Sequence, residues 1–161
     1  MGETQRAPLT IYIPFVIAFS TIQGNTFQPI DDPCNSSETR ELPFLRQRVV
    51  GYKLADGENP ICDQYFYKGW YKMYDNVIAS TDGNCGTDIN WYRKDALPEE
   101  IGKEKNMNYC LNTGNGECGL EETGKVIKCS DEKYVFKLLP LPGCPQAYCI
   151  EKLNNTNGTT T

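Results

Sequence analysis

Eight cysteines are the residues of this chain with the clearest chemistry. They occupy positions Cys34, Cys62, Cys85, Cys110, Cys118, Cys129, Cys144 and Cys149. Thiolates can bind zinc, but structural zinc sites usually combine a short C-x₂₋₄-C pair with a second such pair or with histidines. The chain has no histidine, and its closest cysteines, Cys144 and Cys149, have no second close pair to match them. We therefore predict four disulfides, no metal and no cofactor.

Catalytic groups are scarce. Without histidine, a Ser-His or Cys-His nucleophile cannot be built, and oxidised cysteines are not nucleophiles. Acidic neighbours occur at 31–32, 99–100, 121–122 and 131–132, but adjacent side chains point apart. Residues 82–88 hint at a calcium loop, yet its twelfth position would be Arg93, where an EF-hand needs Glu. We expect no enzyme and no metal site.

An aromatic stretch over residues 65–74 is the strongest candidate for binding. If it is a strand, Tyr65, Tyr67, Tyr71 and Met73 share one face. The other face carries Phe66, Lys68, Trp70, Lys72 and Tyr74. A half-buried strand needs only one apolar face, so the second is either buried beneath outward-reaching lysines or exposed for a sugar or protein. We favour burial, and keep the exposed surface as the candidate binding site.

The first residues have the build of a secretory signal. Their apolar run, from Leu9 to Phe19, is shorter than the roughly 20 residues of a membrane-spanning helix. Small residues at Ala18 and Ser20 suit a signal peptidase, with Gly24 as a second choice. We predict a signal peptide over residues 1–24, cleaved after Ser20 or Gly24. The chain would then be secreted to the oxidising compartment that disulfides need, with no membrane span.

Composition fits one globular domain. A length of 161 residues and a hydrophobic content of 39% allow a single sizeable core. The net charge of −5 argues against nucleic acid as a partner. The end of the chain, assigned to residues 151–161, is rich in Asn and Thr and is expected to be disordered. Three N-x-S/T acceptors predict a glycoprotein: Asn35, Asn154 and Asn157.

Strand patterns outnumber helical ones. β-Branched and aromatic residues concentrate at 49–52, 65–74, 126–129 and 134–138. The polar spacer 130–133 suits a hairpin loop, and only residues 38–50 suggest a short helix. We predict a β-rich fold, all-β or α+β, in a single compact domain with long, disulfide-stapled loops.

The residues around the cysteines form short sequence motifs in a defined order. The motifs are Asp32-Pro33-Cys34, Leu42 to Arg46, Cys62-Asp63, Gly69-Trp70-Tyr71-Lys72, Cys85-Gly86-Thr87 with Trp91, and a closing pattern from Cys129 to Cys149. In this order they resemble the eight-cysteine extracellular domain of the family of uromodulin, the zymogen-granule glycoprotein and the liver-specific zona-pellucida protein. The resemblance extends from Asp32 to Cys149, so we place the domain at residues 32–150.

Sequence alone leaves the cysteine pairing open. The resemblance implies the pairs Cys34–Cys129, Cys62–Cys144, Cys85–Cys149 and Cys110–Cys118. It does not imply filament formation, because the growth-factor-like repeats and zona-pellucida module that accompany this domain elsewhere are not in this sequence. Nor does it imply a mannose-bearing decoy, since the matching stretch, residues 137–139, contains no glycan acceptor.

Together these features predict a secreted, non-catalytic glycoprotein module for extracellular recognition or matrix assembly, with an extracellular protein or glycan as partner. The alternative is a small secreted inhibitor or toxin-like effector that presents a stapled loop. Residues 114–122, partly closed by Cys110–Cys118, would be that loop. Inhibition of a protease by a synthetic copy of the loop would favour the alternative.

Overall fold

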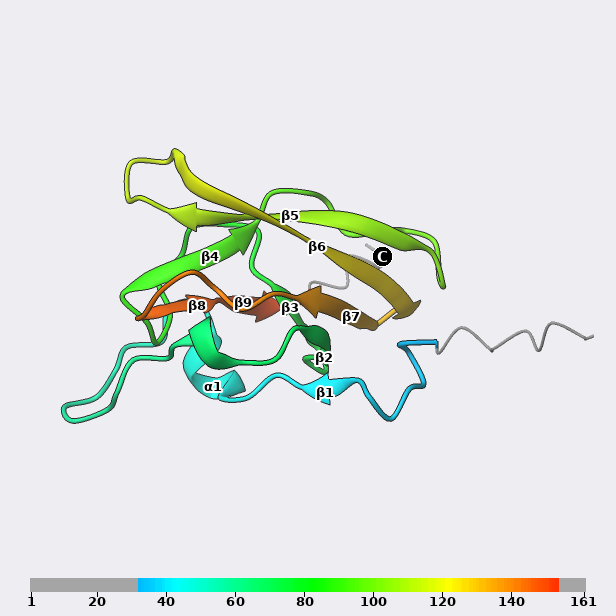
Figure 1. Cartoon of the computed structure of the whole chain (residues 1–161), viewed down its shortest axis with the longest axis horizontal. Coiled ribbons are helices and arrows are strands. Elements are labelled where there is room, and N and C mark those ends of the chain that lie inside the picture. The colour runs from blue at the N-terminus through cyan, green and yellow to red at the C-terminus, as the bar shows by residue number, and fades with distance from the viewer. Residues whose placement is uncertain (1–31, 154–161) are drawn as a thin grey trace, which may run out of the picture. The chain divides into compact units, whose positions relative to one another are not determined.

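A computed structural model gives the structure of residues 32–153 (Figure 1). The signal peptide predicted for residues 1–24 and the acceptors Asn154 and Asn157 lie outside these residues. The described elements are β1 (Arg40–Glu41), α1 (Leu45–Arg48), the 3₁₀ helix η1 (Asp63–Tyr65), β2 (Gly69–Lys72), β3 (Asn76–Ile78), β4 (Ile89–Arg93), β5 (Glu104–Asn112), β6 (Cys118–Ser130), β7 (Lys133–Leu138), β8 (Gln146–Tyr148) and β9 (Ile150–Lys152).

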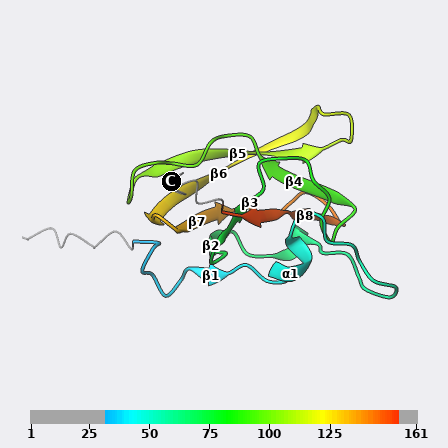
Figure 2. The ribbon, with the colours of Figure 1, turned by 180° about the vertical axis from the view of Figure 1, so that it is seen from behind.

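Seven of these strands form one curled sheet, a half-barrel with the order β1-β2-β7-β6-β5-β4-β8. The inner strands pair antiparallel, while β1–β2 and β4–β8 at the two ends pair parallel. The strands β3 and β9 form a second, two-stranded sheet (Figure 2). The predicted β-rich class is therefore confirmed.

The core lies on the concave side of the curled sheet. Alternate residues of β5, β6 and β7 point into it, among them Met107, Tyr109, Val126 and Phe136, all fully buried. Residues on β2 and β9 join the same cluster. Gly124 leaves room for this packing, because an added Cβ there would lie 2.8 Å from the Tyr109 ring and 2.2 Å from the Lys137 carbonyl oxygen.

Several predicted element boundaries are wrong. The helix expected within 38–50 contains only Leu45–Arg48, since Phe44 before it has a positive φ of 60° and provides no side-chain cap. The strand expected over 65–74 is limited to Gly69–Lys72, and residues 49–52 form a turn with one isolated bridge. The expected hairpin forms, with β6 and β7 extending into its loop.

The domain boundary also moves. We assigned residues 151–161 to a tail, but Glu151 and Lys152 belong to β9. This strand pairs with β3, and its last residue, Lys152, forms an ion pair with Asp75. The folded part therefore extends past residue 150, because the edge of β3 needs a backbone partner.

Eight cysteines form four disulfides. The pairs are Cys34–Cys129, Cys62–Cys144, Cys85–Cys149 and Cys110–Cys118, the same pairs that the resemblance implies. The first three join residues 95, 82 and 64 positions apart. In the chain-entropy model, closing loops of this length stabilises the folded state by about 4.5 kcal/mol per bridge.

Candidate functional site

The outer face of the β2–β7 pair carries the aromatic residue that the sequence singled out. Trp70 lies opposite Lys137, and the neighbouring pair is Tyr71 with Phe136. Tyr71 and Phe136 are buried in the core, so alternation places Trp70 and Lys137 on the outside. Both are half-buried, and the Lys137 ammonium lies 5.8 Å from the centre of the Trp70 ring. This is a cation–π contact.

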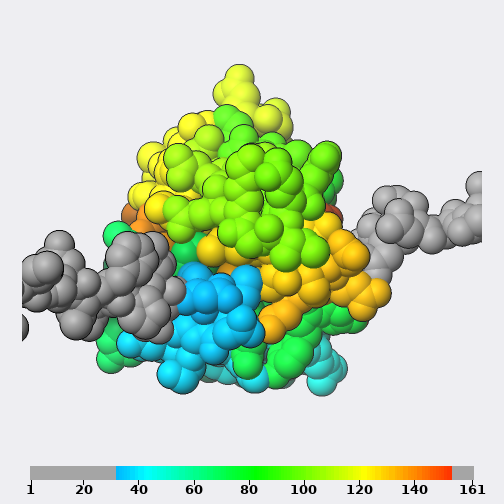
Figure 3. Space-filling model, turned by 90° about the vertical axis from the view of Figure 1, so that its right-hand side faces the viewer, coloured from blue at the N-terminus to red at the C-terminus, as the bar shows by residue number. Residues whose placement is uncertain are grey.

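A loop from the start of the described chain closes the site on a second side. The backbone amides of Asn35 and Ser36 donate to the Asp32 carbonyl, which makes a tight turn. Cys34, inside this turn, is bonded to Cys129 at the end of β6. Figure 3 shows the result: this first segment, in blue, lies against the orange hairpin of β6 and β7.

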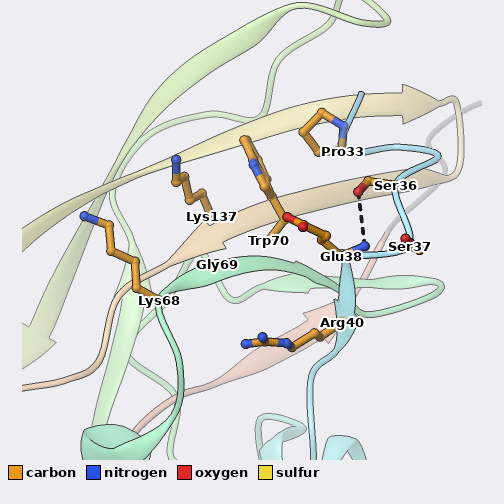
Figure 4. Close-up of a pocket in the computed structure, with 9 residues that line it drawn as sticks. All are labelled: Pro33, Ser36, Ser37, Glu38, Arg40, Lys68, Gly69, Trp70 and Lys137. Atoms are coloured by element: carbon orange, nitrogen blue, oxygen red, sulfur yellow. Dashed lines mark hydrogen bonds between the residues drawn. The ribbon is translucent and has the colours of Figure 1, made fainter. Parts of the chain in front are cut away.

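Between the loop and β2 lies a cavity of about 550 Å³, which we call the Trp70 cleft (Figure 4). The Trp70 side chain rises between Lys137 and the loop that carries Pro33 and Ser36. The Ser36 hydroxyl accepts a hydrogen bond of 3.1 Å from the backbone amide of Glu38. This bond constrains the loop at the edge of the cleft.

Three cations line the Trp70 cleft: Arg40, Lys68 and Lys137. Among residues 32–153 none of the three forms an ion pair. Arg40 instead lies 4.9 Å from the ring centre of the exposed Tyr67. The lining contains one acid, Glu38, so the cleft carries a net positive charge on a chain whose net charge is −5.

The neighbouring strand, β6, carries a further lysine next to Lys137. On β6, Lys125 lies opposite Lys137, and like charges directly opposite each other on a sheet repel. Lys125 is neutralised by an ion pair with Glu104. Lys137 has only the Trp70 ring as a counterpart among the described residues, which leaves its ammonium available to an anion.

The five residues of the predicted surface separate into three places. Lys68 and Trp70 line the cleft. Lys72 and Tyr74 line a different hollow, together with Asp75 and Lys133. Tyr74 has a left-handed φ of 57°. Its hydroxyl donates to Glu41, which lowers the pKa of that carboxyl and raises the pKa of Tyr74 itself.

Phe66 does not belong to this surface. Its ring packs against the core, with ring centroids 5.2 Å from Tyr71 and 6.1 Å from Tyr148. The alternation that we assumed begins only at Gly69, because η1 precedes it and residues 66–68 are not in a strand. Phe66 and Trp70 are both half-buried, but only Phe66 packs against the core cluster, so the burial that we favoured for the whole second face is partial.

A buried ion pair that the sequence did not indicate lies outside the lining of the cleft. The Arg48 guanidinium donates two hydrogen bonds to the Asp63 carboxylate, at 2.7 and 2.6 Å. It also donates to the carbonyls of Pro43 and Tyr148, and Asp63 accepts from the Tyr148 amide. The only sequence signal was Asp63 beside Cys62, since nothing in the pattern marks Arg48 as its partner.

The stapled loop is shorter than expected. Residues 118–122 belong to β6, which leaves 113–117 as the tip between β5 and β6. The polar groups of the tip bond largely within it, with Thr113 donating to the Glu117 carbonyl and Asn115 accepting from the Glu117 amide. Within residues 113–117 no apolar side chain is available to anchor a protein target.

Two other predictions concern surface chemistry. Asn35 is exposed, and its side-chain amide donates to Asp32 at 2.8 Å, so its glycosylation stays a prediction.

At the calcium-like stretch, residues 82–88, the backbone carbonyl of Asp82 accepts a hydrogen bond from Asn112, and the carbonyl of Gly83 accepts one from Asn90. Among residues 32–153 no group of three Cys, Asp or Glu side chains is arranged to hold a metal ion. Over the same residues no helix is long and apolar enough to cross a membrane.

Comparison with protein families places the chain among known domains. The family model that describes the uromodulin-like, eight-cysteine domain matches residues 66–150, more than half of the chain. No curated protein matches. The matched segment contains six of the eight cysteines, and the other two, Cys34 and Cys62, are bonded to Cys129 and Cys144 inside it. The chain belongs to the family of uromodulin-like eight-cysteine domains.

Proposed function

We propose that the chain is a secreted, non-catalytic recognition module that binds an extracellular partner through the Trp70 cleft. Four disulfides and membership of the uromodulin-like family point to an extracellular context. The signal peptide at residues 1–24 and the glycan on Asn35 are part of this proposal. An extracellular matrix component is one form such a partner can take.

The observation that carries the proposal is the outward, half-buried position of Trp70. A tryptophan without a binding role gains most by burial, as Trp91 shows, with no exposed surface. Trp70 instead forms a wall of a cleft beside cations that lack ion pairs among the described residues. Aromatic rings flanked by positive charge are typical of binding surfaces.

The test uses the full chain secreted by eukaryotic cells. Mass mapping of unreduced peptides should find a mature N-terminus after Ser20 or Gly24, with four bridges. The purified protein is then applied to cell surfaces and to extracellular matrix. We expect Trp70→Ala to be secreted normally and to lose binding, while Tyr65→Ala, which removes an 81% exposed ring outside the cleft, leaves binding unchanged.

A second variant keeps the test decisive. If Trp70→Ala is not secreted, Lys137→Glu replaces the neighbouring charge without opening the core. Loss of binding in a secreted Lys137→Glu protein supports the proposal. Equal binding by the Lys137→Glu and Tyr65→Ala proteins would overturn it.

A further inference from the structure

We infer that the Trp70 cleft binds an acidic saccharide, a short sugar chain that bears carboxylate or sulfate groups. This inference rests on the proposed function and names the class of its ligand. Three features support it: the charges of the cleft, its aromatic wall and the shortage of other apolar groups in its lining.

The charges select an anion. Most lysines of the described chain are neutralised locally: Lys72, Lys94, Lys103, Lys125, Lys128 and Lys152 each form an ion pair. The cleft, by contrast, collects three cations without an ion pair, Arg40, Lys68 and Lys137. Glu38 is the one acid in the lining and cannot balance three cations. Like charges held close together repel, and a bound carboxylate or sulfate would supply further negative charge.

The remaining lining selects a sugar. A pyranose ring has an apolar face that can pack on an indole, and Trp70 offers such a wall. Its hydroxyls need hydrogen-bonding partners, which Ser36, Ser37 and the Glu38 carboxylate can provide. The cavity volume of about 550 Å³ lies within the roughly 300–1,000 Å³ of small-molecule sites, and suits a few sugar rings.

An acidic peptide fits less well. Peptides commonly bind by adding a strand to an open sheet edge, but the edge strand beside the cleft, β1, has only 2 residues and offers little backbone to pair with. Other peptide modes need apolar pockets for side chains, and the apolar lining here is limited to Pro33, Gly69 and Trp70. A peptide is therefore the alternative that the test must separate from a saccharide.

The test measures binding of four probes to the full secreted protein by calorimetry or ligand-observed NMR. The probes are sialyllactose (carboxylated), a heparin-derived tetrasaccharide (sulfated), neutral lactose and a hexaglutamate peptide. We expect one or both acidic saccharides to bind, with affinity that falls as salt rises. Lactose and hexaglutamate should bind at least tenfold more weakly.

Charge-neutralising variants locate the site. Lys68→Gln and Lys137→Gln should each weaken saccharide binding about tenfold, the loss expected for one charge-assisted hydrogen bond. Lys53→Gln is the matched control, because Lys53 is exposed and lies outside the cleft. Unchanged unfolding curves for all three variants would exclude a folding defect.

Other outcomes overturn the inference. These are binding of hexaglutamate in preference to the saccharides, equal binding of lactose, equal losses in Lys53→Gln, or no binding by any probe. The proposed function is tested separately from the saccharide assignment. If Trp70-dependent binding to cells or matrix survives enzymatic removal of sialic acid and sulfated glycans, the recognition role stands and only the saccharide assignment falls.

Discussion

The ion pair of Arg48 with Asp63 and the cations of the Trp70 cleft use positive charge in opposite ways. Arg48 is fully buried and donates four hydrogen bonds, two of them to Asp63. In the cleft, Arg40 and Lys68 are exposed and have no ion pair among the described residues. The contrast separates charge that holds the fold together from charge that is available to a ligand, and predicts that substitutions at the two places affect different measurements.

The largest effect is expected at the buried pair. Asp63→Asn removes the negative charge beside Arg48, and an uncompensated buried charge costs about 3–5 kcal/mol of unfolding free energy. Secretion should fall sharply, and guanidinium unfolding of the remaining protein should show the loss. The double variant Arg48→Met/Asp63→Leu should lose less than the single one. Equal losses would show that the pair does not act as a unit.

A second substitution tests the support beneath the cleft. Gly124→Ala puts a Cβ within 2.2 Å of the Lys137 carbonyl and 2.8 Å of the Tyr109 ring. Since neither backbone nor buried ring can move freely, we expect a loss of about 1–3 kcal/mol in unfolding free energy. Gly69→Ala is the control, because nothing lies within 4 Å of its added Cβ. Similar unfolding curves for both variants would contradict this close packing.

The two tryptophans sharpen the comparison. Trp91→Ala empties a buried site and should cost about 3–5 kcal/mol, whereas Trp70→Ala should cost only about 1 kcal/mol, as for a partly exposed side chain. Ligand binding should show the reverse order of sensitivity, with Trp70→Ala abolishing it in folded protein. Chemical unfolding paired with the binding assay checks both. A large stability loss at Trp70 would make it a core residue.

The smallest effect concerns Glu41. The Tyr74 hydroxyl holds the pKa of this carboxyl below its ordinary value, so the contact favours the folded state above pH 4.5 and is lost as the pH falls through the lowered pKa. Tyr74→Phe should raise the pKa of Glu41, measured by NMR titration. The pKa of Glu58, which is lowered by the backbone amide of Ala55 and by the Tyr52 hydroxyl, serves as reference and should not move.

The sequence predicted the class of the fold and the number of disulfides, because cysteine count and β-branched runs are local properties of the chain. It predicted the hairpin of β6 and β7 for the same reason. It missed β4 and the long β5, where residues such as Asn106 and Asn108 dilute the strand pattern. These strands form because their backbones pair with neighbours on both sides, which is information from distant parts of the chain.

The candidate site was half predictable. Lys68 and Trp70 stood out by type and spacing, but Arg40 and Lys137 join them only through the pairing of β1 and β7 with β2. Phe66 was misplaced since η1 interrupts the alternation. Contacts between residues far apart in the chain, such as Arg48 with Asp63, leave no periodic pattern in the sequence, so spacing alone could not have revealed them.

The connectivity of the disulfides constrains the order of events while the chain is being made. Each of the three long bridges has its second cysteine at position 129, 144 or 149. Because synthesis proceeds from the N-terminus, Cys34, Cys62 and Cys85 cannot form these bridges until the last third of the chain has been made, whereas Cys110 and Cys118 can pair earlier. Loss of Cys144 and Cys149 would leave Cys62 and Cys85 without their partners.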